Sequence, residues 1–267
     1  MTTQTEPTTT ATTHPFTPGM RLDLVASEAD VELFFDRTTP EAEVVITASE
    51  PAYLEHSLKT SRSDDRLEVV VPPLLTAGPE KGFALQIGRF SLSLGHTAGV
   101  TVEVHLPAGS AVRVDGGSGD LRLEGRPGTV QLDTRSGDIT LDVLEAGQLR
   151  SASGDITVDE IAAERPVTLA SSSGDLAVER CTGPVELGTS SGDITLSSMG
   201  AGELTARTSS GDITVGVVAG LPVWQELSTA SGDLDNRLSS RGEPVGGAPR
   251  LQARIRTASG DLSLHDA

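Results

Sequence analysis

The sequence predicts an all-β fold, a right-handed parallel β-solenoid with about 18–20 residues per coil and an atypical N-terminal cap. The first observation behind this prediction is a short motif, Ser-Gly-Asp followed by an aliphatic residue, which occurs eight times. Successive motif aspartates are 18, 17, 20, 18, 19, 21 and 28 residues apart, and a near-constant period of this length is typical of repeat architectures. These aspartates are Asp120, Asp138, Asp155, Asp175, Asp193, Asp212, Asp233 and Asp261.

The second observation is an apolar alternation on either side of the motif. Counted from the aspartate, positions −6 and +1 are apolar in all eight copies. Position +3 is apolar except at Asn236, and position −8 is apolar except at Gly147 and Gln225. Because period-2 alternation is typical of half-buried strands, each repeat is predicted to contain two short strands, one on each side of the motif.

The two strands of a repeat are predicted to meet at a corner. Positions −4 and +1 are an odd number of residues apart, so a continuous strand would turn one set of aliphatic residues into water. A bend at Ser-Gly-Asp returns both sets to one core, and we expect glycine there because it tolerates positive φ angles. Parallel stacking is favoured over antiparallel hairpins, whose tight turns prefer Asn-Gly or Asp-Gly in that order. Parallel crossovers are overwhelmingly right-handed, which sets the predicted hand.

The region before the regular repeats differs in composition. Residues 1–17 are rich in threonine and are predicted to be a disordered tail. Residues 18–107 alternate as strands do, carry no helical stripe and are predicted to be capping coils of the solenoid. Within them, Ser27-Glu-Ala-Asp30 looks like a worn copy of the motif, with Ala29 in the place of glycine. Residues 108–267 are then the regular Ser-Gly-Asp repeat solenoid.

The C-terminal part of the repeats contains an irregularity. Residues 238–250, rich in glycine and proline, lengthen the last interval and are predicted to be a loop insertion at the surface. The last coil ends soon after Asp261 without an evident cap, and an open sheet edge invites pairing. We therefore expect the C-terminal coil to be covered by the insertion or by another subunit.

Charge and composition exclude several functions. The net charge is −18, much of it from the motif itself, and no basic run is present, which argues against binding of nucleic acid or of anionic membranes. The single cysteine, Cys181, rules out an intrachain disulfide. Neither a signal peptide nor a membrane-spanning apolar run is visible, so the predicted location is cytoplasmic, with an unconventional export route to the surface left open.

The row of motif aspartates allows two interpretations. In the structural one, each carboxylate accepts hydrogen bonds from backbone N–H groups at its own corner, as in Asx turns, which offsets the repulsion between stacked carboxylates. In the alternative, the row binds Ca²⁺, the one cofactor considered, which prefers six to eight oxygen ligands. The residues of that alternative metal site are Asp120, Asp138, Asp155, Asp175, Asp193, Asp212, Asp233 and Asp261.

No catalytic site is predicted. Eight equivalent carboxylates offer no pair with unlike pKa values, which acid–base catalysis requires. The histidines are scattered singly, and no Gly-x-Ser-x-Gly motif, phosphate-binding loop or zinc-ligand spacing occurs. The prediction is that the protein is not an enzyme.

A resemblance to a known family rests on one run of sequence. Residues 102–125, with Leu-Pro-Ala-Gly followed by the first Ser-Gly-Asp, together with the later copies of Thr-x-Ser-Gly-Asp-Ile-Thr-Val, resemble the bacterial β-strand-repeat family catalogued as putative adhesins, a domain of unknown function. The resemblance covers about residues 20–267. It implies a right-handed β-solenoid and no established activity.

The leading functional prediction is therefore a non-catalytic structural or interaction scaffold. Long repeat faces without a pocket suit extended binding, so we expect a protein partner or self-association through the solenoid edges. The alternative is a calcium-binding or carbohydrate-active β-helix protein that uses the stacked aspartates.

Overall fold

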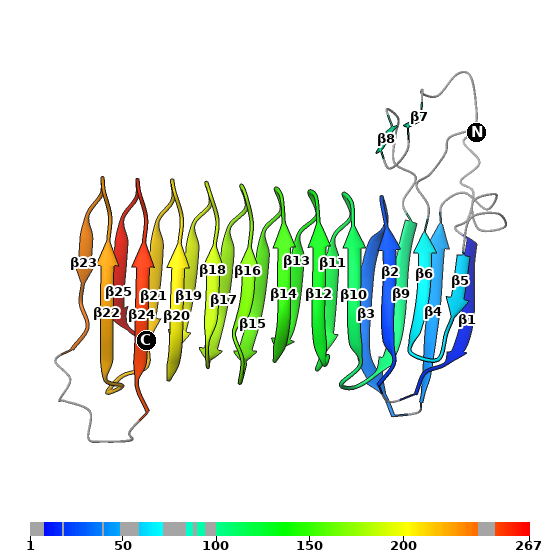
Figure 1. The fold of residues 1–267 in the computed structure, drawn as a ribbon, viewed down its shortest axis with the longest axis horizontal. Helices are drawn as coiled ribbons and strands as arrows, with labels where there is room; N and C mark the ends of the chain where they lie inside the picture. Colours follow the sequence, from blue (N-terminus) through cyan, green and yellow to red (C-terminus); the bar gives the residue numbers. More distant parts are fainter. Residues whose placement is uncertain are drawn as a thin grey trace, which may run out of the picture.

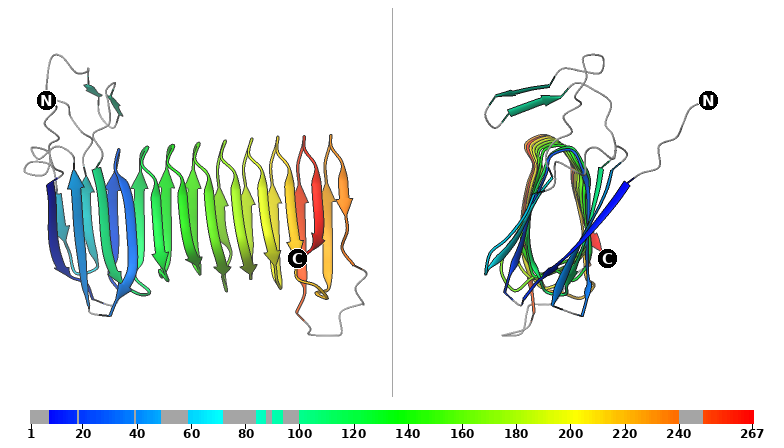
Figure 2. Two further views of the ribbon diagram at one scale, coloured as in Figure 1. Left: turned by 180° about the vertical axis from the view of Figure 1, so that it is seen from behind. Right: turned by 90° about the vertical axis from the view of Figure 1, so that its right-hand side faces the viewer.

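The computed structural model describes residues 8–17, 19–38, 40–48, 59–71, 84–87, 90–93, 100–239 and 249–267. These residues form β-strands joined by short turns, and no helix occurs among them. Two long sheets face each other along the stack, as Figure 1 shows from the side and the right-hand view of Figure 2 shows along the stacking axis. The predicted class, an all-β solenoid built of parallel coils, is confirmed for this part of the chain.

Each regular coil contributes one strand to each sheet. The strand before the motif lies in an 11-stranded sheet, and the strand after it lies in a 12-stranded sheet. The strands before the motif are β10 (Ala111–Gly116), β12 (Thr129–Thr134), β14 (Ala146–Ser151), β16 (Val167–Ala170), β18 (Val185–Gly188), β20 (Gly202–Arg207), β22 (Val223–Ser228) and β24 (Leu251–Arg256). The strands after it are β11 (Leu121–Gly125), β13 (Ile139–Leu144), β15 (Ile156–Ala162), β17 (Leu176–Thr182), β19 (Ile194–Met199), β21 (Ile213–Val217), β23 (Leu234–Asn236) and β25 (Leu262–Asp266).

The core lies between the two sheets and is filled by columns of equivalent residues. Parallel pairing places Leu132, for example, between Val114 and Leu149 of the neighbouring coils. The apolar residues at positions −6 and +1 are buried in every coil except that of Asp233. The change of phase at the motif therefore does return both sets of aliphatic residues to one core, as predicted. A further buried column, not isolated by the sequence pattern, lies at or near the ends of the second strands and includes Leu144, Ile161, Cys181 and Met199.

The coil of Asp30 confirms the worn copy of the motif. Strands β2 (Arg21–Ala26) and β3 (Asp30–Arg37) pair in parallel with β10 and β11, although 90 residues separate Asp30 from Asp120. Beyond this coil, β6 (Arg66–Val71) and β9 (Val100–Pro107) continue the parallel stack, and β1 (Thr8–Pro15), β4 (Glu41–Ala48) and β5 (Lys59–Arg62) close it with antiparallel pairs. Strands β7 (Ala84–Ile87) and β8 (Phe90–Ser93) form a separate two-stranded sheet.

Part of the predicted disordered tail is a strand. β1 pairs with β4 along its whole length, from Thr8 opposite Ala48 to Pro15 opposite Glu41. The prediction of disorder is therefore wrong for residues 8–15. The physical reason is that β4 presents an open edge, and a threonine-rich segment has the β propensity to pair with it. Residues 1–7 of the predicted tail lie outside the described part of the chain.

The C-terminal coils are stacked out of sequence order. In one sheet β24 lies between β20 and β22, and in the other β25 lies between β21 and β23. The last coil of the sequence is thus covered on both sides, and the coil of Asp233 forms the end of the stack. The expectation that the C-terminal coil is the open edge, covered by the insertion or by another subunit, is wrong. Residues 238–250 instead connect β23 in the end coil to β24, which belongs to the next coil inward. Residues 240–248 lie outside the described part.

The motif glycine is required for close stacking rather than for an unusual backbone angle. Among the motif glycines only Gly232 and Gly260 have positive φ, so the expected reason for glycine is wrong for most copies. A Cβ atom on Gly174 would lie 2.0 Å from the carbonyl oxygen of Gly154 in the neighbouring coil. A similar clash would occur at the other regular motif glycines, because each corner lies directly on the backbone of the preceding one.

We expect Gly174→Ala to destabilise the protein by roughly 1–3 kcal/mol, because the added methyl group forces two backbone corners apart. Gly188→Ala is the matched control, since a Cβ atom there meets nothing within 4 Å and its φ is negative. Thermal unfolding monitored by circular dichroism compares the two variants with the wild type. Equal melting temperatures for both variants would contradict the stacking explanation.

Candidate functional site

The motif aspartates form one continuous ladder along the edge of the stack. The backbone N–H of each aspartate donates a hydrogen bond to Oδ1 of the aspartate in the neighbouring coil, at N–O distances of 2.7–3.1 Å. The donor thus belongs to the next coil and not, as expected, to the aspartate's own corner. In spatial order the ladder consists of Asp30, Asp120, Asp138, Asp155, Asp175, Asp193, Asp212, Asp261 and Asp233.

A second set of main-chain bonds strengthens the same corners. The N–H of the residue that follows each aspartate donates to the carbonyl oxygen of the next aspartate, as from Ile156 to Asp175 at 2.9 Å. Each inner rung therefore contacts its neighbours through its N–H, its carbonyl oxygen and Oδ1. Stacked carboxylates about 4.8 Å apart repel by roughly 0.9 kcal/mol in water. A charge-assisted hydrogen bond contributes about 1.5–3 kcal/mol, so the ladder stabilises the stack on balance.

A parallel row of hydroxyl groups supports the corner from inside. Position −4 is serine or threonine in seven coils, and several of these side chains, such as Ser171 and Thr208, are almost fully buried. The Oγ atom of Ser171 donates to the carbonyl oxygen of Gly154 in the neighbouring coil and accepts from the N–H of Gly174 in its own coil. The sequence reasoning missed this role. The signal was present, because an inward-facing position that so regularly carries a hydroxyl must bond to something.

The histidines and the cysteine do not converge on a common site within the described residues. His105 lies with Nε2 2.7 Å from Glu103 Oε1 and Nδ1 3.1 Å from Asp36 Oδ2, and its ring stacks on Phe34. Cys181 is buried in the core, and burial raises the pKa of its thiol to about 12, so it remains a neutral thiol at physiological pH. His56 and His96 lie outside the described part of the chain.

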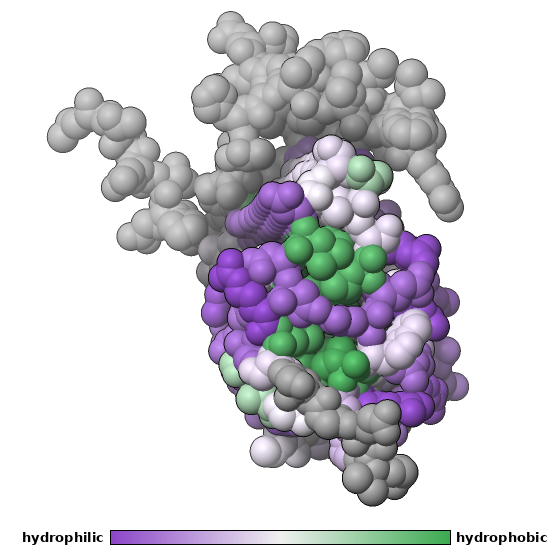
Figure 3. Space-filling view, turned by 90° about the vertical axis from the view of Figure 1, so that its left-hand side faces the viewer, coloured by the Kyte–Doolittle hydropathy of each residue, from purple (hydrophilic) through white to green (hydrophobic). Residues whose placement is uncertain are grey.

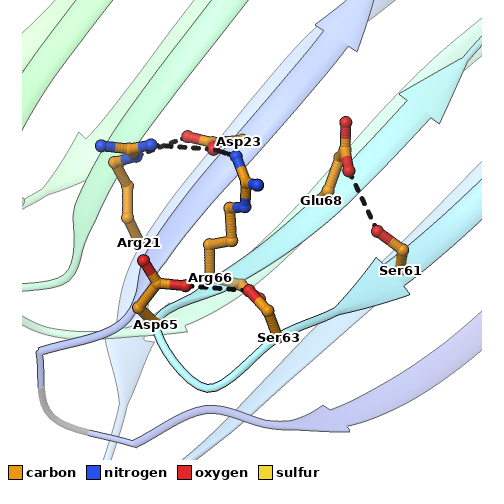
Figure 4. Close-up of polar contacts among 7 residues, drawn as sticks. All are labelled: Arg21, Asp23, Ser61, Ser63, Asp65, Arg66 and Glu68. Carbon is orange, nitrogen blue, oxygen red and sulfur yellow. Dashed lines mark hydrogen bonds and ion pairs between the residues drawn. The ribbon is translucent and has the colours of Figure 1, made fainter.

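Charged groups near the N-terminal end join neighbouring strands of the outer face. Asp23 on β2 contacts Arg21 of the same strand, at 2.5 Å, and Arg66 of the adjacent strand β6, at 3.6 Å, as drawn in Figure 4. The hydrogen bond from Arg21 holds the pKa of the Asp23 carboxyl below its usual value, against the opposing effect of partial burial. Nearby, Ser63 Oγ donates to Asp65, and Ser61 Oγ donates to Glu68. Of these pairs, Arg66–Asp23 joins β6 to β2 and Ser61–Glu68 joins β5 to β6.

The described residues contain no group of three or more His, Cys, Asp or Glu side chains placed to hold a metal ion.

A pocket beside the N-terminal coil is lined by uncharged residues that include Phe16, Met20, Pro40 and Pro107. Within the described ranges no helix is long and apolar enough to cross a membrane.

Fold and site together define a class of protein, a two-sheeted parallel β-solenoid held together by ladders at its corners. The chain belongs to the Toastrack DUF4097 family, whose model matches residues 21–265. A search of curated proteins gave no match.

Solved structures with the same fold are distant in sequence. A putative adhesin from Parabacteroides merdae is 10% identical with a TM-score of 0.54, and the alignment covers 96% of each chain. A putative lipid binding protein from Parabacteroides distasonis is 15% identical with a TM-score of 0.52, covering 95% of this chain and 96% of that one. A putative adhesin from the same species is 11% identical with a TM-score of 0.51, covering 97% of each. At these identities the likeness concerns the fold alone.

We expect Asp155→Ala to destabilise the protein by about 1 kcal/mol, because the N–H of Asp175 loses its acceptor. Asp155→Asn should cost less, since the amide oxygen still accepts. Asp159→Ala is the control, because Asp159 is an exposed carboxylate outside the ladder. Melting temperatures of the three variants test this order. A loss for Asp159→Ala as large as that for Asp155→Ala would show that the ladder bond is not the cause.

Proposed function

We propose that the protein is a non-catalytic interaction scaffold. The observation that carries the proposal is the use of the repeated aspartate: in each successive pair of coils its Oδ1 bonds to a backbone N–H. The charged group that recurs through the whole repeat region therefore supports the stack itself. The surfaces left for function are the long outer faces of the two sheets, and repeat proteins use such extended faces to bind extended partners. The proposal includes a right-handed winding of the coils, because parallel crossovers are overwhelmingly right-handed.

The outer face of the 12-stranded sheet is the better candidate for binding. Position +2 on this face carries a broken row of four threonines in parallel register, with Thr140 beside Thr157 and Thr195 beside Thr214. Ala177 lies between the two pairs. The outward hydroxyl groups of these threonines offer both donors and acceptors to an extended chain or a polymer. Adhesion, the role in the names of two of the structural neighbours, would use a face of this kind.

A comparison of the two faces tests the scaffold proposal. One variant carries lysine at Thr140, Thr157, Thr195 and Thr214. The matched control carries four lysines on the outer face of the other sheet, at Gln131, Gln148, Thr168 and Thr205. We expect a partner captured from the native host by the wild type and by the control, and lost with the threonine-row variant. Identical capture by both variants, or no saturable binding by the wild type, would contradict the proposal.

Calcium binding is the alternative use of the aspartate row, since the ladder aligns nine carboxylates, one per coil. We expect millimolar Ca²⁺ to leave the melting temperature unchanged, because one oxygen of each inner carboxylate already accepts a backbone hydrogen bond. A ligand that binds only the folded state raises the melting temperature. A calcium-dependent rise that is absent in Asp155→Asn and unaffected in Asp159→Ala would favour the alternative instead.

A further inference from the structure

The end of the stack formed by β22 and β23 exposes apolar residues of the core. Figure 3 looks onto this end and shows apolar patches between polar surroundings. Leu234 is 48% exposed, although its counterparts in all the other regular coils are buried. Val223, Leu227 and Leu238 are only partly buried against the core. The coil that ends the stack thus presents the cross-section of the core to solvent.

The same end presents open main-chain groups in both sheets. Along β22 the carbonyl oxygens of Pro222 and Ser228 accept from the N–H groups of Leu251 and Thr257 in the neighbouring coil. The alternate residues, including Leu227, therefore direct their N–H and C=O groups away from the stack. In β23 the Asp233 carbonyl oxygen accepts from Leu262, so Leu234 and Asn236 point outward in the same way. The open edges of the two sheets are separated by the distance between the packed sheets. A second pair of strands with the same separation therefore fits them best.

The opposite end of the stack is less open to pairing, chiefly in one of its two sheets. The edge strand there is β5, which is four residues long and carries Lys59 and Arg62, and the edge strand of the other sheet, β1, ends at Pro15. Short, charged or proline-containing edge strands discourage pairing with another chain. Of the two ends, the β22–β23 end is therefore the one suited to association. An interface made by the same surface of both partners closes as a dimer and does not grow into a filament.

We propose that the β22–β23 end binds the same end of a second copy of this chain, with antiparallel pairing across a two-fold axis perpendicular to the sheets. Pairing of the two β23 edges about Asn236, continued through Arg237 and Leu238 beyond the end of each strand, places Leu234 opposite Leu238 and Asp235 opposite Arg237 of the other copy. The same axis places the two β22 strands opposite each other near Leu227. The order Leu-Asp-Asn-Arg-Leu is self-complementary in both charge and hydrophobicity, which selects a second copy as the occupant. The interface is independent of the outer-face binding proposed above.

The first test is the mass and shape of the full chain in solution. We expect light scattering to give twice the monomer mass of 27.6 kDa, and small-angle X-ray scattering to show a particle about twice as long as the monomer. Leu234→Lys should weaken the dimer at least about tenfold, because it puts two charges into the interface. Val25→Lys is the matched control, since Val25 is an exposed apolar residue on β2, away from this end. A monomer at all concentrations, or a dimer joined side by side, would overturn the proposal.

The second test uses the predicted charge pairs and is insensitive to a folding defect. Asp235→Arg and Arg237→Asp should each weaken self-association, because like charges then face each other across the axis. An equimolar mixture of the two single variants should regain the dimer, since one chain then presents arginine at both positions and the other presents aspartate at both. Mixing cannot restore an ion pair lost within one chain, such as that between Arg237 and Asp235. Two single variants that dimerise like the wild type, or a mixture that stays monomeric, would reject this register.

Discussion

The structure depends on how closely neighbouring coils approach at the Ser-Gly-Asp corner. The glycines lie directly on one another, at a separation that leaves no room for a Cβ atom. This approach places each motif aspartate nitrogen 2.7–3.1 Å from Oδ1 of the aspartate in the neighbouring coil, and it brings the hydroxyl group at −4 to the glycine carbonyl oxygen of that coil. Three residue types are therefore required together: glycine for contact, aspartate for the outer ladder and serine or threonine for the inner one. The motif recurs because each coil must satisfy the corner of the next.

Much of this arrangement follows from the sequence, because solenoid coils repeat their chemistry in register. The two-strand coil, the corner and the inward positions could be predicted, and so could the coil of Asp30, where the motif is worn. What could not be predicted is contact between segments that the period does not relate. The strand formed by Thr8–Pro15 arises from the edge of β4 and leaves no apolar alternation in its own sequence.

The candidate site was predicted less completely than the fold. A carboxylate ladder follows from the spacing, but the donor to each carboxylate depends on the separation of two backbones, and sequence patterns do not contain that distance. The buried hydroxyl row at −4 could have been inferred, because a serine or threonine at an inward position needs a partner. Regular stacking places the ladder carboxylates in equivalent surroundings. Acid–base catalysis requires a pair of carboxylates in unlike surroundings, so the ladder does not provide such a pair.

The out-of-order C-terminal coils follow from the same requirement for burial. The coil that ends the sequence has Ala253, Ile255, Leu262 and Leu264 at its inward positions, and all four are almost fully buried. The coil before it contains the two polar exceptions to the pattern, Gln225 and Asn236, and it forms the end of the stack. Placing the more apolar coil inside removes more apolar surface from water than sequential stacking would. The polar exceptions are thus the sequence signal for the end of the stack. These polar residues only partly reduce the apolar character of the end, because Leu234 and Leu227 remain. The end is also open in both sheets and self-complementary in charge. Covering by another chain would therefore stabilise the molecule more at this end than elsewhere.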